Sequence, residues 1–119
     1  MPWEPVASQE HLVDVRTTKA RIVVFVTAPA NCYLCKLVEP KIRTFADDLD
    51  FSDIAFYSLD VDRVSIEHDP QLSAVSTLPV FLLYARGSLR EIVPVTREQR
   101  PGRLLARAIK KTFPLVEDG

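Results

Sequence analysis

The sequence has few cysteines, few glycines and no long hydrophobic run. Its 119 residues include two cysteines, three glycines and one tryptophan, and its formal net charge is −1. Two cysteines are too few for the disulfide scaffold of a small secreted protein. A nearly balanced charge gives no global field that would draw the chain to nucleic acid or to a membrane surface. Because its apolar runs are far shorter than the roughly 20 residues that a membrane-spanning helix needs, we predict no transmembrane segment.

The composition indicates one soluble domain. With 47% hydrophobic residues, the chain can bury a core without disulfide bonds. No internal repeat, low-complexity tract or linker divides it, so we expect a single domain over residues 1–119. The first residues, Met1–Pro5, are not basic and no long apolar stretch follows them, which argues against a signal peptide. We therefore expect an intracellular, cytoplasmic protein whose thiols are mostly reduced.

Hydrophobic periodicity and turn residues predict alternating helices and strands. Continuous β-branched and aromatic runs indicate buried strands, and apolar residues at helical spacing indicate helices. The predicted elements are, in order, a helix capped by Ser8 that runs to about Val15, a strand Arg21–Thr27, a helix from Cys32 with Pro40 inside it, a strand Ile54–Val61, a short helix opening at Asp69-Pro70, a strand Val80–Tyr84, a hairpin partner Leu89–Val93 and a helix Pro101–Phe113. The early strands, separated by helices, should be parallel, and the last pair should form an antiparallel hairpin. The expected fold class is α/β, with a mixed four- to five-stranded sheet flanked by helices on both faces.

The two cysteines stand three positions apart in the tetrad Cys32-Tyr33-Leu34-Cys35. A predicted buried strand precedes them and a helical pattern follows, which is the context in which a C-x-x-C pair acts as a redox site. The unpaired amides and the positive dipole end of that helix would stabilise a thiolate on Cys32. Cys35, one turn further on, could then attack a mixed disulfide that Cys32 had formed.

Spaced motifs further along the chain carry a family resemblance. Pro40 lies five residues after Cys35, Leu59-Asp60-Val61-Asp62 ends a predicted strand, and Thr77-Leu78-Pro79 opens the next one. In this combination, from about Ser8 to Phe113, the chain resembles the thioredoxin family. The resemblance implies a thioredoxin-like fold and a cis peptide bond at Leu78-Pro79, beside the cysteine pair.

The resemblance also implies a thiol–disulfide oxidoreductase that acts on protein substrates. Cys32 is similar to the family's exposed nucleophile, and Cys35 is similar to its more buried resolving thiol. The candidate site residues are the catalytic Cys32 and Cys35 and the substrate-contacting Tyr33, Leu34, Leu78 and Pro79. The implied partners are disulfide-containing protein substrates and an upstream reductase, with no cofactor and no metal. The sequence does not indicate an oligomeric state.

Several residues depart from the thioredoxin pattern. Tyr33-Leu34 stands where typical thioredoxins have Gly-Pro, so we expect an altered redox potential. Val26 and Ser58 stand where the family has a buried aspartate and the lysine paired with it. Without that carboxylate, release of a mixed disulfide should be slower, since the attacking group is a thiolate. Val95 stands in place of a groove glycine, and its side chain should narrow the approach of a substrate backbone.

Other functions stay open on the sequence alone. The chain could be a thioredoxin-fold interaction module or complex subunit whose cysteines are structural or vestigial. It could also be a switch whose disulfide senses oxidants rather than processing substrates. A zinc site is disfavoured, because His11 and His68 are the only histidines and neither has conventional ligand spacing to the two cysteines.

Overall fold

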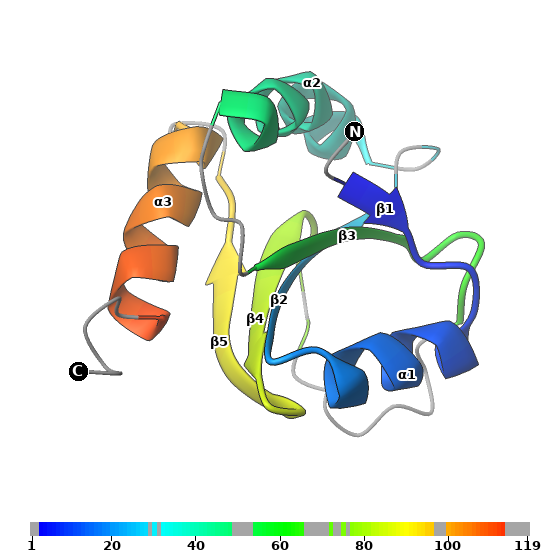
Figure 1. Cartoon of the computed structure of the whole chain (residues 1–119). Coiled ribbons are helices and arrows are strands. Elements are labelled where there is room, and N and C mark those ends of the chain that lie inside the picture. Colours follow the sequence, from blue (N-terminus) through cyan, green and yellow to red (C-terminus); the bar gives the residue numbers. More distant parts are fainter. Residues whose placement is uncertain are drawn as a thin grey trace.

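The computed structural model of the chain shows a five-stranded mixed sheet between helices (Figure 1). It describes residues 3–28, 30, 32–48, 54–65, 72, 75, 77–96 and 100–113. The strands are β1 (Trp3–Pro5), β2 (Arg21–Thr27), β3 (Ala55–Asp60), β4 (Val80–Ala85) and β5 (Ser88–Pro94). Their order across the sheet is β1-β3-β2-β4-β5. This order places β2 and β4, which are buried along most of their length, next to each other.

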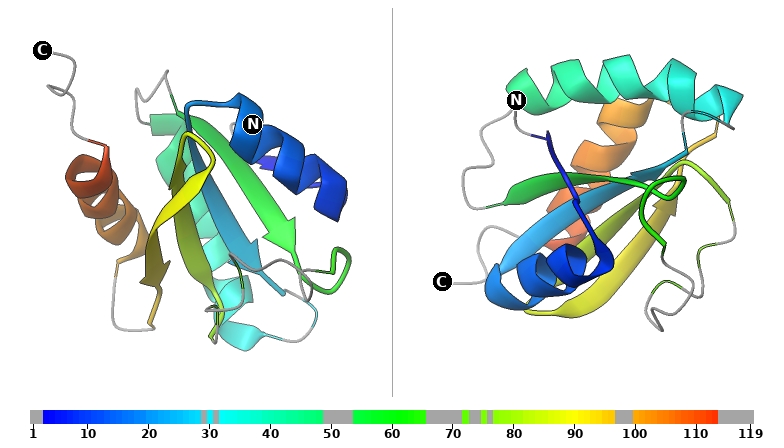
Figure 2. Two further views of the ribbon diagram at one scale, coloured as in Figure 1. Left: turned by 90° about the horizontal axis from the view of Figure 1, so that it is seen from below. Right: turned by 90° about the vertical axis from the view of Figure 1, so that its right-hand side faces the viewer.

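Helices cover both faces of this sheet. They are α1 (Gln9–Thr18), α2 (Tyr33–Asp48) and α3 (Pro101–Thr112). Helix α1 lies on one face, and α2 and α3 lie on the other, as the two views in Figure 2 show. The predicted fold class is therefore confirmed. Over the described ranges, each helix falls short of the length and apolarity that crossing a bilayer requires.

Strand β4 does not run in the predicted direction. β2 and β3 are parallel as expected, with Val24 opposite Tyr57. β4 instead pairs with β2 in antiparallel register, with Val24 opposite Leu82, so the prediction of parallel early strands is wrong for β4. β4 begins at the end of the sheet where β3 stops, and it therefore runs back along β2. The short helix predicted at Asp69-Pro70 lies outside the described residues.

The sequence patterns give no sign of β1, because three residues are too few to show a period and one of them is proline. β1 pairs in parallel with β3, at the edge of the sheet where a proline is tolerated. The buried Trp3 ring meets Phe25 and Phe56 edge-on, and its Nε1–H donates to the carbonyl of Ile42 at 3.2 Å. The indole therefore ties the edge of the sheet to α2.

A side-chain cap sets the start of α1. Ser8 Oγ accepts a hydrogen bond from the backbone N–H of His11 at 3.0 Å, which confirms the predicted N-cap. The helix continues beyond the predicted end near Val15, as far as Thr18. The Thr18 hydroxyl donates to the carbonyl of Asp14 at 2.8 Å, an arrangement that lets a threonine remain in the last turn.

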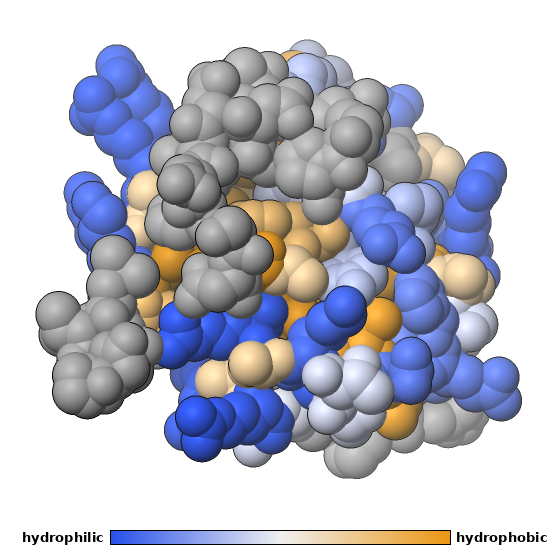
Figure 3. All heavy atoms as spheres, viewed as in Figure 1, coloured by the Kyte–Doolittle hydropathy of each residue, from blue (hydrophilic) through white to orange (hydrophobic). Residues whose placement is uncertain are grey.

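The sheet separates two clusters of buried side chains. Because alternate residues of a strand point to opposite faces, β2 supplies Val23 and Phe25 to the cluster beneath α2 and α3. It supplies Ile22, Val24 and Val26 to the cluster beneath α1. Figure 3 shows hydrophilic residues around the apolar ones on the face seen in Figure 1. Burial on both faces explains why β2 reads as a continuous apolar run rather than an alternating one.

β4 and β5 form the predicted antiparallel hairpin, and a two-residue turn closes it. Arg86 and Gly87 have φ angles of 53° and 85°, the left-handed conformation that tight hairpin turns need. The backbone N–H of Arg86 also donates to the carbonyl of Ala20 at 2.8 Å. The turn is thereby joined to the start of β2, at the end of the sheet away from the cysteines.

Helix α3 allows a matched test of the core. Ile109 is 2% exposed, whereas Arg107 on the same helix is exposed. We expect Ile109→Ala to lower the free energy of unfolding by about 2–5 kcal/mol, because it leaves a cavity against the sheet. Arg107→Ala should change it by no more than about 0.5 kcal/mol. Urea denaturation followed by circular dichroism measures both values, and equal losses would contradict this packing.

Candidate functional site

Cys32 and Cys35 form a disulfide at the start of α2. Their Cα atoms are 5.2 Å apart, within the usual range for such a bond. Cys32 is the residue immediately before α2 begins at Tyr33, and Cys35 lies in the first turn. The helix continues through Pro40 to Asp48. The predicted strand–loop–helix setting of the pair is therefore confirmed.

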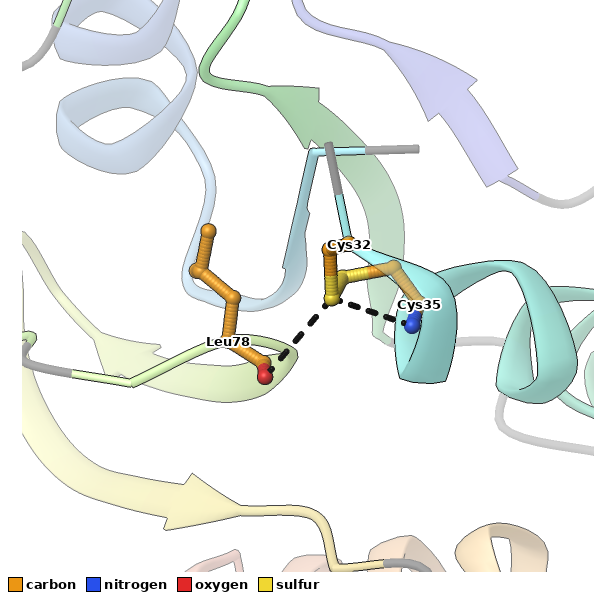
Figure 4. Close-up of a disulfide and its surroundings, with 3 residues drawn as sticks. All are labelled: Cys32, Cys35 and Leu78. Carbon is orange, nitrogen blue, oxygen red and sulfur yellow. Dashed lines mark hydrogen bonds between the residues drawn. A yellow bond between two sulfur atoms is a disulfide. The ribbon is translucent and has the colours of Figure 1, made fainter. Parts of the chain in front are cut away.

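Two polar groups face the Cys32 sulfur (Figure 4). The backbone N–H of Cys35 donates to Cys32 Sγ at 3.1 Å. The same sulfur lies 3.9 Å from the carbonyl oxygen of Leu78. The amide donor favours negative charge on this sulfur, and the positive end of the α2 dipole acts in the same sense. In the reduced protein, a protonated Cys32 thiol would have the Leu78 carbonyl as its acceptor.

The turn before β4 brings Leu78 to this sulfur. The Leu78-Pro79 peptide bond is cis, as the resemblance implied. Pro79 is buried, and its carbonyl accepts a hydrogen bond from the N–H of Val95 at 3.1 Å. The start of α2, the turn before β4 and the end of β5 therefore meet at the disulfide.

The two sulfur-bearing residues differ in exposure. Cys32 is half-buried, whereas Cys35 is fully buried at 0% exposure. A sulfur of another molecule can approach Cys32 from solvent, but it has no such approach to Cys35. This difference gives the two cysteines unequal chemistry, although both belong to one short segment.

A shallow groove of about 600 Å³ adjoins the disulfide segment and the Leu78 turn. Its lining residues are Tyr33, Leu34, Thr77, Leu78, Pro94, Val95 and Thr96. Three of the predicted substrate-contacting residues, Tyr33, Leu34 and Leu78, therefore lie together in one surface. Tyr33 is the most accessible of the large apolar side chains described, with 69% of its surface exposed. The fourth predicted residue, Pro79, is buried and is not part of the lining.

Sequence reasoning missed three residues of this groove: Thr77, Pro94 and Thr96. Each of them is adjacent in the sequence to Leu78 or Val95, which the sequence analysis placed at the substrate groove. This adjacency could have identified them as groove residues. Val95 itself is 5% exposed and packs in the cluster beneath α2 and α3. Its effect on the width of the groove stays a prediction.

Val26 and Ser58 do not face each other. In the parallel register of β2 and β3, Val26 pairs with Leu59, and Ser58 pairs with Phe25. Val26 belongs to the cluster beneath α1, whereas Phe25 packs beneath α2. The correspondence of Val26 and Ser58 to the family's aspartate and lysine stays a prediction, and in this sheet the residue opposite Ser58 is Phe25. An aromatic ring stands opposite Ser58 on the side of the sheet that α2 covers.

Within the described residues, no group of three or more histidine, cysteine, aspartate and glutamate side chains could hold a metal ion. His11 is engaged locally, because its Nδ1 accepts a hydrogen bond from the N–H of Ala7 at 2.9 Å. Its ring also meets that of Tyr57 edge-on. His68 lies outside the described residues.

The pKa of Tyr57 is raised by burial, and the negative charges of Glu4 and Asp14 raise it further. Tyr57 belongs to the cluster beneath α1. Because α2 and its cysteines lie on the other face of the sheet, this shift does not tune the disulfide.

The arrangement defines a thioredoxin-fold protein whose disulfide-forming cysteine pair opens a helix beside a cis-proline turn. The family model described as Thioredoxin matches residues 3–111. The chain therefore belongs to the thioredoxin family.

Individual relatives agree with this placement. The chain is 43% identical over 56 residues to Thioredoxin-2 of Saccharomyces cerevisiae, a stretch of 47% of this chain and 50% of that protein. The match thus spans half the length of this curated relative. A mutant thioredoxin from Halobacterium salinarum is 27% identical, with a TM-score of 0.71 and coverage of 97% of this chain and 96% of the other. A thioredoxin from Malassezia sympodialis, 21% identical, shares the fold with a TM-score of 0.75 over 92% and 90% of the two chains.

The unequal exposure of the cysteines predicts unequal alkylation of the reduced protein. Cys32 should react with limiting iodoacetamide on the order of tenfold faster than Cys35, because only its sulfur is approached from solvent. Mass spectrometry of peptides cut between the two residues measures the ratio. In denaturant the two rates should converge. Equal rates in the native protein would show that Cys35 is not protected as described.

Proposed function

We propose that this protein is a thiol–disulfide oxidoreductase that exchanges its Cys32–Cys35 disulfide with disulfides of protein substrates. Membership of the thioredoxin family supports oxidoreductase activity in general. The observation that carries the proposal is the half-buried Cys32 sulfur, which receives a hydrogen bond from the N–H of Cys35 at the start of α2. The buried Cys35 sulfur, already bonded to it, is the resolving group.

In the reducing direction the exchange has two steps. The Cys32 thiolate attacks one sulfur of the substrate disulfide, so a mixed disulfide forms, the substrate bond breaks and the other substrate sulfur leaves as a thiolate. The Cys35 thiolate then attacks Cys32 Sγ, which forms the Cys32–Cys35 bond and releases the second substrate thiolate. The substrate gains two electrons and the pair loses two. The same steps in reverse oxidise a dithiol substrate.

Repeated turnover in the reducing direction needs an upstream dithiol reductase that returns two electrons to the pair. A reducing compartment such as the cytoplasm would supply one. We propose that this protein works in the cytoplasm with an upstream dithiol reductase as its partner.

The groove supports protein segments as substrates. Tyr33, Leu34 and Leu78 line it, and the Leu78 carbonyl lies beside the Cys32 sulfur. An extended segment seated there would bring its own disulfide to Cys32. We assign these three residues to substrate contact, and we assign Pro79, which is buried, to holding the Leu78 backbone in place.

Two cysteine variants test the reaction. Cys32→Ser should lose all catalysis of insulin reduction by dithiothreitol, because it removes the attacking sulfur. Cys35→Ser should still complete the first step and therefore accumulate mixed disulfides, which non-reducing electrophoresis detects. Both variants should keep the wild-type circular dichroism spectrum. Equal turnover by wild type and Cys32→Ser would remove the catalytic role.

The competing function is an interaction module with structural or vestigial cysteines. Ser58 stands where the family has the lysine paired with a buried aspartate, and Phe25 lies opposite Ser58 in the sheet. A phenyl ring cannot accept a proton from a thiol as a carboxylate does, and this difference favours the interaction module. If the module is correct, wild type will not accelerate insulin reduction over dithiothreitol alone, and Cys35→Ser will trap no substrate. An oxidant sensor would instead form its disulfide rapidly with peroxide and also trap no substrate.

Tyr33→Ala tests the groove apart from the chemistry. We expect KM for a protein disulfide to rise about threefold to tenfold, because an exposed aromatic contact is lost. The rate with a small aromatic disulfide should stay unchanged, since such a substrate does not fill the groove. Leu37→Ala is the matched control, because Leu37 is also exposed on α2 and does not line the groove. A rise in KM for both variants, or for neither, would contradict this assignment.

A further inference from the structure

Helix α3 carries a row of positive side chains along its outer face, which we call the cationic stripe. Its members, all of them exposed, are Arg100, Arg103, Arg107, Lys110 and Lys111. Because these positions recur at intervals of three or four residues, they fall within roughly 100° of the circumference of the helix. The buried side chains of α3, among them Leu105 and Ile109, lie on the opposite face.

The stability of α3 does not explain the cationic stripe. The helix contains no acidic residue between Pro101 and Thr112. Arg107 stands four residues from both Arg103 and Lys111, and like charges at this spacing repel each other. Arg103 also lies in the first turn, where the positive end of the helix dipole favours acidic side chains instead. The stripe therefore costs stability in the free protein, and an anionic partner would relieve the repulsion.

The described surroundings of the stripe do little to compensate its charge. Within the part of the chain that the structure describes, no carboxylate pairs with any of its five side chains. The neighbouring strand β5 carries one cation, Arg90, and one carboxylate, Glu91. Glu4 and Asp14 act on the other face of the sheet, where they raise the pKa of Tyr57 in the cluster beneath α1. The α3 side therefore attracts anions, although the formal net charge of the chain is −1.

The cationic stripe begins close to the groove beside Cys32. Thr96 lines that groove, and Arg100 follows it four residues later. Four residues span at most about 14 Å, so the Cα atom of Arg100 lies within that distance of the Cα atom of Thr96. From Arg100 the stripe continues along the helix axis for about 16 Å to Lys111. A partner segment lying along α3 can therefore reach the groove with one of its ends.

The spacing of the stripe fits an extended acidic segment. Arg103, Arg107 and Lys111 recur about every 6 Å along the helix axis. In an extended chain, alternate side chains point to the same side and lie about 6.6 Å apart. Acidic residues at three alternate positions of such a chain can thus each face one of these cations.

Two other anionic partners fit the stripe less well. Binding in a membrane surface needs apolar side chains beside the cations, whereas those of α3, such as Leu105 and Ile109, are buried against the sheet. Single-stranded nucleic acid is bound by cations together with aromatic side chains on which the bases stack. The cationic stripe contains no aromatic residue. A protein segment is therefore the partner that these observations favour.

We propose that the cationic stripe binds an extended segment of a protein partner that has acidic residues at alternate positions. Binding along α3 brings the adjoining part of that partner to the groove and to Cys32. The stripe thereby selects, among disulfide-containing proteins, those with an acidic segment beside the reactive disulfide. This selection rests on the proposed exchange reaction, whereas binding of the acidic segment does not.

Binding is tested on the oxidised protein, without any reaction. The probe is the peptide Ser-Glu-Ser-Glu-Ser-Glu-Ser, and the same peptide with glutamine in place of glutamate is the neutral control. Titration of the isotope-labelled protein should give saturable changes in the backbone N–H signals of α3. We expect the glutamate peptide to bind about threefold to tenfold more tightly than the glutamine peptide, because three exposed ion pairs each contribute a small amount. Raising the salt from about 20 mM to about 300 mM should remove most of this difference.

Two double variants of equal net charge test where the acidic peptide binds. Arg103→Gln combined with Arg107→Gln removes two cations from the stripe. Lys19→Gln combined with Arg63→Gln removes two exposed cations outside α3. Only the first combination should lose the preference for the glutamate peptide. Because all four side chains are exposed, both proteins should keep the wild-type circular dichroism spectrum.

The selection of substrates is tested with the same peptides carrying one cysteine at either end, activated as a 2-thiopyridyl disulfide. The Cys32 thiolate of the reduced protein attacks the peptide sulfur, so a mixed disulfide forms and 2-thiopyridone leaves as its anion, which absorbance measures. For at least one position of the cysteine, the glutamate peptide should react about threefold to tenfold faster than the glutamine peptide at low salt. This ratio should fall towards one in the Arg103→Gln, Arg107→Gln protein and stay unchanged in the Lys19→Gln, Arg63→Gln protein.

Several results would overturn the proposal. Equal affinity for the glutamate and glutamine peptides would do so, as would signal changes confined to residues outside α3 or the same loss of preference in both double variants. A thymidine tetranucleotide also carries three negative charges and should bind less tightly than the glutamate peptide. Tighter binding of the tetranucleotide would indicate a nucleic-acid partner and exclude the proposed one.

The two kinds of measurement separate this proposal from the exchange reaction. If the glutamate peptide binds to α3 but no peptide reacts with Cys32, the exchange reaction is wrong and the binding site is confirmed. If all the peptides react at the same rate, the exchange reaction is supported and the selection of acidic substrates is wrong. The comparison of peptides needs no variant, so it decides the question even where a double variant does not fold.

Discussion

The position of one sulfur, Cys32 Sγ, between the N–H of Cys35 and the carbonyl of Leu78 depends on the arrangement of the whole sheet. β2 leads into α2, and the Leu78 turn leads into β4. Because β2 and β4 are adjacent and antiparallel, the end of one lies beside the start of the other. A parallel β4 would place its first residue at the opposite end of the sheet, far from the disulfide. The disulfide and the Leu78 turn can therefore form one site only because β4 runs antiparallel to β2.

Local signals in the sequence predicted much of this arrangement. The run Arg21–Thr27 gave the bounds of β2 because both faces of the strand are buried, and Ser8 marked the start of α1 through its hydroxyl. The spacing and setting of Cys32 and Cys35 indicated a redox pair, whereas the cis bond at Leu78-Pro79 was expected only from the family resemblance. What local signals did not provide was the direction of β4 or the existence of β1. Both depend on pairing between segments far apart in the chain, which has no local period.

The face on which each β2 residue lies shows a related limit. It depends on the pairing of the strand with its neighbours, which no local pattern in the sequence reveals. Because side chains alternate, a shift of one residue moves a position from one side of the sheet to the other. The structure accordingly places Phe25, and not Val26, beneath α2.

The separation of the two buried clusters by the sheet also matters for how this protein can change over time. Side chains such as Val24 and Leu82 pack beneath α1 and lie across the backbone layer from the cysteine helix. Leu78, whose carbonyl faces the Cys32 sulfur, nevertheless packs against this same cluster. Replacing core residues beneath α1 can therefore disturb the disulfide through the Leu78 turn. The exposed face of α1 has no such route, so it is the surface that can be redesigned with the least effect on reactivity.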